Sequence, residues 1–155
     1  MTITGLIDAP KADKEFLSIN GAQGFSTFYG YYMLEAMAMA GNYQGALDVI
    51  REYWGAMIDL GATSFWEDFD INWIPNAAPI DELVPEGKKD IHGDCGAYCY
   101  VGFRHSLCHG WASGPTSWLS RHILGVEVIE PGCRQVRITP HLGDLQWVNC
   151  LLYTS

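Results

Sequence analysis

The sequence predicts a mainly α-helical chain that passes into short β-strands near its C-terminus. Apolar residues recur at steps of three and four between positions 25 and 58, and the spacing shortens after Gly125. The 155 residues are 48% hydrophobic and only 17% charged, which fits one globular domain or a piece of a larger one. We therefore expect a helical layer followed by the start of a β module.

Two long helices are predicted, and together they form a hairpin. The first ends at the glycine cap Gly41, and its apolar face, which we expect to be buried, comprises Phe25, Phe28, Tyr29, Tyr32, Met33, Ala36, Met37 and Ala40. Asn42 caps the second helix, which runs to Gly61 with an apolar stripe of Ala46, Leu47, Ile50, Tyr53, Trp54, Met57 and Ile58. Because only two residues separate the helices, they are expected to lie antiparallel.

Shorter elements are predicted in the second half of the chain. One helical stretch lies within Gly96–Cys108, and another runs from about Gly114 to Leu124 with Pro115 in its first turn. Two short strands, 126–129 and 135–139, flank a turn rich in proline and glycine.

The other segments lack a helical period. Residues 1–23 mix proline, glycine and charged residues, so we expect a connecting segment there. Residues 62–89 collect three prolines together with Trp66, Phe69 and Trp73. A loop this long and this aromatic is more often functional than structural filler.

The charge balance favours a neutral, polyhydroxylated ligand. Eighteen acidic and nine basic residues give a net charge of −9, so no basic footprint for nucleic acid or an anionic membrane surface is expected. No segment approaches about 18 uninterrupted apolar residues, so no membrane span is predicted. Six Trp and eight Tyr offer faces that can stack on sugars, although each of them can equally be part of the core.

The cysteine usage favours a cytoplasmic protein with reduced thiols. The chain has an odd number of cysteines, and they lack the regular spacing of a disulfide framework: Cys95, Cys99, Cys108, Cys133 and Cys150. The first residues also lack the basic and apolar regions of a signal peptide. A secreted or periplasmic protein stays open, because we expect the true N-terminus to lie upstream.

The last six residues, 150–155, differ from the rest of the chain. They are apolar and break off without a turn, and one set of codons for them, TGT CTC TTA TAC ACA TCT, spells a transposon end used in sequencing adapters. We therefore expect residues 150–155 to be translated adapter and the natural chain to depart after about Asn149.

A cluster of carboxylates follows the second helix. Glu67, Asp68 and Asp70 stand among Trp66 and Phe69. Apolar neighbours desolvate a carboxylate and a second carboxylate repels its charge, and both effects raise a pKa toward the range useful for acid–base catalysis. The alternative is that the two aspartates are solvated loop residues and that Glu67 pairs with an arginine.

Histidines and cysteines form a second cluster, at His92, Cys95, Cys99, His105 and His109. Spacings of four could bring two ligands to one helix face, so a zinc site is conceivable. The spacing matches neither a zinc knuckle nor an H-E-x-x-H helix, and buried cysteines acting as small hydrophobes are the better interpretation. We expect no metal and no cofactor.

Several motifs, taken in order, resemble the C-terminal part of the bacterial α-L-rhamnosidases of glycoside hydrolase family 78. Two of them, Gly61–Glu67 and Ser106–Leu119, resemble the catalytic barrel of that family. Three others, 125–126, 130–132 and 138–145, are similar to its passage into a β-sandwich. The resemblance implies that residues 1–124 are the C-terminal portion of an (α/α)6 barrel and that residues 125–149 begin a C-terminal β-sandwich.

The resemblance also implies a set of roles. Glu67 would be the general base of an inverting hydrolysis of terminal α-L-rhamnosyl residues, and His109 would contact the sugar. Cys108 stands where many members carry Asn. The general acid lies on an upstream segment of that family, so we expect these residues alone to be inactive. A deoxy sugar with a methyl group would suit a pocket that includes Trp66, Trp73 and Trp111. Rhamnose-containing glycosides or oligosaccharides are the expected partners.

Two alternatives stay open at this point. The first is another (α/α)6-barrel glycosidase or phosphorylase with a similarly placed base, since a fold does not fix a substrate. The second is a carbohydrate-binding or structural module without catalysis, because one carboxylate without an acid partner cannot carry out inversion.

Overall fold

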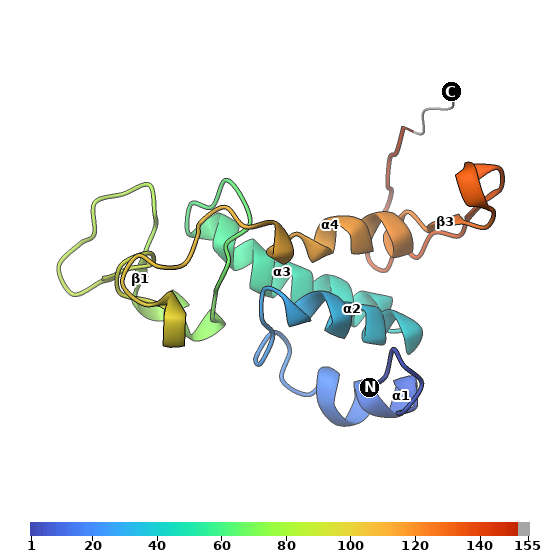
Figure 1. The fold of residues 1–155 in the computed structure, drawn as a ribbon, viewed down its shortest axis with the longest axis horizontal. Coiled ribbons are helices and arrows are strands. Elements are labelled where there is room, and N and C mark those ends of the chain that lie inside the picture. Colours follow the sequence, from blue (N-terminus) through green and yellow to red (C-terminus); the bar gives the residue numbers. More distant parts are fainter. Residues whose placement is uncertain (152–155) are drawn as a thin grey trace.

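The computed structural model describes residues 1–151, and its fold is mainly α-helical, as the sequence predicts. Helix α2 (Tyr29–Met39) lies against both α3 (Tyr43–Asp59) and α4 (Gly114–Trp118). A long irregular segment occupies one end of this layer, and a β-hairpin projects from the other end (Figure 1). Residues 152–155 of the expected adapter segment lie outside the described residues.

The predicted hairpin of α2 and α3 is confirmed. Gly41 adopts a positive φ of 78°, and the N–H of Asn42 donates to Met37 O at 2.9 Å, which closes the end of α2. Asn42 then caps α3, because its Oδ1 accepts the N–H of Gly45 at 2.9 Å. The side-chain amide of Asn42 also donates to Asp13 Oδ2 and to Ser18 Oγ.

The buried face of α3 holds the irregular segments in place. The hydroxyl of Tyr53 donates to Phe69 O, and Trp54 Nε1 donates to Ala112 O at 3.0 Å. Both side chains are buried in the core, and Met57 joins them one turn later. Since buried polar groups are costly without partners, these two bonds fix where the loops at positions 69 and 112 cross the helix.

The prediction for the N-terminal segment is wrong over residues 9–17. These residues form α1 (Ala9–Ala12) and a π-helical turn (Asp13–Leu17). Asp8 caps α1 by accepting the N–H of Lys11 at 3.0 Å. Only Ala12 of these helical residues is buried, so the sequence carries no apolar stripe by which this helix could be recognised.

The helix predicted within Gly96–Cys108 is also wrong. The structure has a single 3-10 turn there, Tyr98–Tyr100. Positive φ angles at Tyr98 (55°) and Phe103 (64°) prevent a continuous helix. Other short elements complete this end of the molecule: a 3-10 helix at Ile71–Asn76, and a parallel bridge between β1 (Ala77–Ala78) and β2 (Lys89–Asp90).

The C-terminal elements follow the prediction. A 3-10 turn (Gly110–Ala112) leads into α4, which continues as a π-helix (Leu119–Ile123). Strand β3 (Val126–Val128) pairs antiparallel with β4 (Val136–Ile138) around a 3-10 turn at Pro131–Cys133.

The hairpin leaves the helical layer at Gly125. This residue has a φ of +71°, and a Cβ atom added there would lie 1.9 Å from Thr139 O. Only glycine therefore fits between the last helix and the strand that returns to it.

One face of α2 differs from the prediction. Tyr29, Tyr32 and Phe28 were expected in the core but are exposed, whereas Leu34 and Ala38 were not expected there and are buried together with the expected Ala36 and Met37. The helix is apolar on most sides, so its sequence does not select a single face. Among residues 1–151, none of the helices has both the length and the apolar character needed to cross a bilayer.

We predict that Asn42→Ala lowers the free energy of unfolding by about 1–2 kcal/mol, because it removes the cap of α3. Urea unfolding followed by circular dichroism measures this loss. Asn42→Ser is the matched control, since serine keeps a cap acceptor but loses the amide bonds to Asp13 and Ser18. Equal stability of Asn42→Ala and the wild type would contradict the assignment of the cap.

Candidate functional site

Two segments from distant parts of the sequence lie side by side beyond the end of α3. Phe65 O accepts the N–H of His109 at 2.7 Å, and Ser106 O accepts the N–H of Glu67 at 2.8 Å. The two segments thus pair in the manner of antiparallel strands. This pairing brings together Glu67 and His109, the two residues to which the sequence assigns a role.

Glu67 is fixed at its backbone and at one oxygen of its carboxylate. The N–H of Ser106 donates to Glu67 Oε2 at 2.7 Å, a short bond of the charge-assisted kind. The carbonyl of Glu67 accepts a bond from the hydroxyl of Thr27 and another, at 2.9 Å, from Trp111 Nε1. The side chain is only 15% exposed. These contacts restrict the carboxylate to one orientation.

The other carboxylate oxygen of Glu67 faces His109. The distance from Oε1 to His109 Nδ1 is 3.7 Å, which is longer than a hydrogen bond and suits an ion pair if the imidazole is protonated. The imidazole is 34% exposed and packs on Trp111 with ring centroids 4.4 Å apart. Oε1 therefore keeps lone pairs free for a water molecule or a hydroxyl group.

Asp68 is the second carboxylate of this segment. Burial raises the pKa of Asp68 above its ordinary value, while a favourable interaction with His105 and the N–H groups of Phe69 and Ala97 oppose the rise. Desolvation is the largest of these effects, so the environment favours the protonated form more than water does. Asp68 is therefore partly desolvated rather than a fully solvated loop residue.

The three tryptophans named from the sequence occupy different environments. Trp111 is 39% exposed and lies between His109 and Phe28, whose ring centroid is 5.6 Å away. Trp73 is half-buried and lines a separate cavity of about 150 Å³, together with Asn72, Asn76, Lys89, Asp94, Cys95 and Gly96.

Trp66 is fully buried, and its indole packs against Phe69 with centroids 5.8 Å apart. No face of Trp66 is open to a sugar, so the structure does not support its expected role in binding. Successive side chains point to opposite sides of a segment that pairs like a strand, which turns Trp66 inward next to Glu67. We leave Trp66 out of the candidate site.

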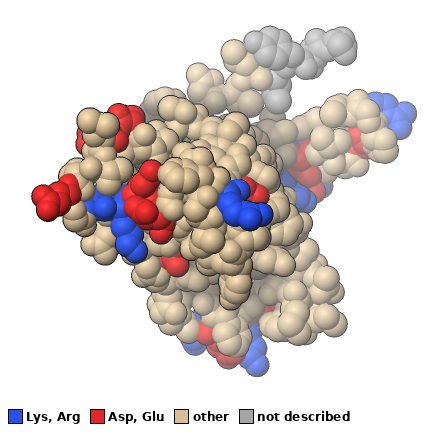
Figure 2. Space-filling view, turned by 60° about the vertical axis from the view of Figure 1, so that its left-hand side comes forward, with Lys and Arg blue, Asp and Glu red and all other residues tan. Residues whose placement is uncertain are grey.

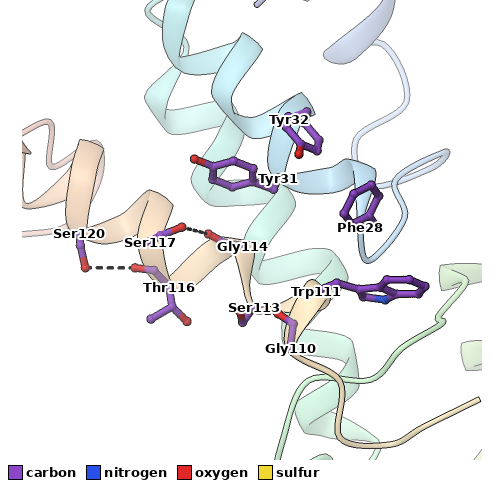
Figure 3. A pocket seen from close by; sticks show the side chains of 10 residues that line it. All are labelled: Phe28, Tyr31, Tyr32, Gly110, Trp111, Ser113, Gly114, Thr116, Ser117 and Ser120. Carbon is purple, nitrogen blue, oxygen red and sulfur yellow. Dashed lines mark hydrogen bonds between the residues drawn. The ribbon is translucent and has the colours of Figure 1, made fainter.

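A pocket of about 430 Å³ lies beside Trp111, between the starts of α2 and α4; we name it the α2–α4 pocket. Figure 3 shows aromatic side chains from the α2 side and hydroxyl side chains from the α4 side. Its lining residues are Phe28, Tyr31, Tyr32, Gly110, Trp111, Ser113, Gly114, Thr116, Ser117 and Ser120. None of these residues is charged.

The second cluster stabilises the loop, because two of its histidines contact backbone carbonyl groups and one of its cysteines is buried. His92 Nε2 lies 2.9 Å from His105 O, and His105 Nδ1 lies 2.9 Å from Tyr100 O. Cys95 is buried, and burial raises the pKa of its thiol. In the part of the chain that the structure describes, no group of three His, Cys, Asp or Glu side chains is arranged to hold a metal ion.

Charged side chains are spread thinly over one face of the molecule. Figure 2 shows acidic and basic side chains in small separate groups on a surface that is otherwise uncharged. Within the site itself, the charged group in contact with His109 is Glu67. This environment suits a neutral ligand better than a charged one.

Several residues of the site were not identified as such from the sequence. Thr27 and Ser106 act on Glu67 through a hydroxyl–carbonyl bond and a backbone N–H, and neither contact has a sequence signature of its own. Phe28 and Tyr32 were assigned to the buried face of the helix, and Tyr31 was given no role. The excess of aromatic residues at the start of α2 was the available signal for them.

Searches against protein-family models and curated protein sequences gave no match to this chain. The resemblance to the α-L-rhamnosidases therefore rests on the motifs and on the residues that they contain.

We predict that stability falls as the pH rises from the ordinary pKa of an aspartate to the raised pKa of Asp68. Over that interval the unfolded chain loses a proton that the folded chain retains, which favours unfolding. Asp68→Asn should remove this decline and be more stable than the wild type at neutral pH. Urea unfolding at a series of pH values from 4 to 7 measures the slope, where about 4 is the ordinary pKa of an aspartate.

The matched control is Glu86→Gln, which changes an exposed carboxylate in the same long irregular region. Its pH dependence should follow that of the wild type. An unchanged slope in Asp68→Asn would contradict the desolvation of Asp68.

Proposed function

We propose that this chain carries the general base of an inverting glycosidase, and that Glu67 is that base. The observation that carries the proposal is the unequal state of the two oxygens of Glu67: Oε2 is held by the N–H of Ser106, and Oε1 is open beside His109. A base needs a fixed direction and a free lone pair, and this arrangement supplies both.

In the proposed reaction, Oε1 of Glu67 takes a proton from a water molecule as that water attacks the anomeric carbon. An inverting enzyme keeps its acid and base about 6.5–9.5 Å apart so that the water fits between base and sugar. His109 lies next to the base and binds a hydroxyl group of the sugar. The general acid, which protonates the departing oxygen, belongs to an upstream segment in this proposal.

The proposed substrates are glycosides or oligosaccharides with a terminal α-L-rhamnosyl residue. The motifs around Glu67 and His109 support this sugar. The indole of Trp111 also supports rhamnose as the sugar, since the indole packs on the imidazole of His109 and offers an apolar surface to the methyl group of rhamnose. The uncharged lining of the adjoining α2–α4 pocket fits a neutral sugar.

We further propose that α2, α3 and α4 belong to an (α/α)6 barrel and that β3 and β4 begin a β-sandwich. The hairpin of α2 and α3, with α4 against α2, supports the first part. The exposed apolar side chains Val128, Val136 and Ile138 support further strands over the β-hairpin. The free thiols of Cys95, Cys99, Cys108 and Cys133 support a cytoplasmic location.

We predict that Glu67→Gln lowers turnover of an aryl α-L-rhamnoside about a hundredfold or more in the longer enzyme that this proposal implies. Glutamine keeps the acceptor for Ser106 N–H but cannot take a proton from water. Sugar binding should be largely spared. Release of the aryl group measures turnover, and NMR of the first-formed rhamnose measures inversion.

Glu86→Gln is the control and should retain wild-type turnover. Near-normal turnover of Glu67→Gln would remove Glu67 as the base, and retention of configuration would contradict the inverting mechanism. Preference for an aryl glycoside of another sugar would favour a different glycosidase on the same scaffold.

A further inference from the structure

The α2–α4 pocket has two chemically different walls. The aromatic wall consists of Phe28, Tyr31, Tyr32 and Trp111, and the hydroxyl wall consists of Ser113, Thr116, Ser117 and Ser120 (Figure 3). Its volume of about 430 Å³ lies in the range of small-molecule sites. A ligand that fits has one apolar face and several hydroxyl groups, and a pyranose ring has both.

The hydroxyl wall is prepared to accept hydrogen bonds. Ser113 Oγ donates to Gly110 O at 2.6 Å, Ser117 Oγ donates to Gly114 O at 3.0 Å, and Ser120 Oγ donates to Thr116 O at 3.1 Å. Each hydroxyl proton is thus used within the turn or helix, while the oxygen keeps lone pairs. The hydroxyl groups of a sugar are the donors that this wall lacks.

The pocket begins where the Glu67–His109 pair ends. Trp111 donates to Glu67 O, packs on the imidazole of His109 and also lines the pocket. The indole of Trp111 is therefore shared by the pair and the pocket. One sugar ring beside Glu67 and a second ring in the pocket satisfy this geometry.

The composition of the pocket distinguishes a sugar from a packed protein segment. A helix that covered this face would bury the free lone pairs of four hydroxyl side chains between Ser113 and Ser120, with few donors of its own to offer them. Three of the aromatic residues, Phe28, Tyr32 and Trp111, are more than a third exposed, and Phe28 packs against both of the others, so they form one contiguous patch.

We propose that the α2–α4 pocket binds the leaving-group sugar, a neutral hexopyranose ring joined to the rhamnosyl residue. This inference rests on the proposed function of Glu67 and His109, because it places the second ring relative to them. The aromatic wall stacks on the apolar face of the ring, and the hydroxyl wall accepts bonds from its hydroxyl groups.

Saturation-transfer NMR with the disaccharide rutinose, an α-L-rhamnosyl-D-glucose, tests this proposal on the 155-residue chain. The two rings have separate resonances, so each ring reports on its own site. In the wild type, both rings should receive saturation. Thr116→Leu fills the pocket and Tyr32→Ala removes part of the aromatic wall, and both residues are exposed, so the fold is kept.

Both variants should lose saturation of the glucosyl ring, and Tyr32→Ala should weaken binding of the disaccharide about two- to tenfold, the worth of one aromatic contact. Tyr98→Ala is the matched control: Tyr98 is an exposed tyrosine that does not line the pocket. It should leave both rings unchanged.

His109→Ala separates the two proposals. Loss of rhamnosyl saturation in His109→Ala supports the proposed function, and its persistence contradicts that function alone. Persistent glucosyl saturation in Thr116→Leu and Tyr32→Ala overturns the pocket assignment, as does the absence of glucosyl saturation in the wild type.

Discussion

The arrangement of the site depends on two neighbouring side chains of α3 that form buried hydrogen bonds to loops. Tyr53 binds the carbonyl of Phe69, and Trp54 binds the carbonyl of Ala112. The two paired segments of the site lie directly before these carbonyls in the sequence: residues 64–67 precede Phe69, and residues 106–109 precede Ala112. Leaving such a buried carbonyl without a partner costs about 1–3 kcal/mol, so the loops are held to these crossing points and their pairing follows.

The sequence predicts the regular part of this fold well. A helical period with a glycine and an asparagine at its interruption is enough to locate α2, α3 and their connection. Prediction from the sequence fails where the structure does not depend on a repeat of apolar residues. Helix α1 is short and buries one alanine, and residues 96–108 are shaped by positive φ angles at Tyr98 and Phe103. These features depend on contacts across the chain, which a local pattern does not record.

The candidate site is predictable to a similar degree. Glu67 and His109 are found from motifs and lie together in the structure. Trp66 is assigned wrongly, because adjacency in sequence places it on the opposite side of the segment. Ser106 and Thr27 act on Glu67 through hydrogen bonds in which one partner is a backbone group. Such bonds are set by tertiary structure, and residue type alone does not reveal them.

Gly125 has a consequence for how the two parts of the molecule are oriented. Two strands of three residues make too few contacts to choose a direction by themselves, so the hairpin takes its direction from the backbone that leads into it. That direction is encoded by the absence of a side chain, since a Cβ at position 125 would collide with Thr139 O. Any residue other than glycine would act as a wedge at the base of the hairpin, forcing Thr139 away from position 125 and breaking the bond from Thr139 N–H to the carbonyl of residue 125.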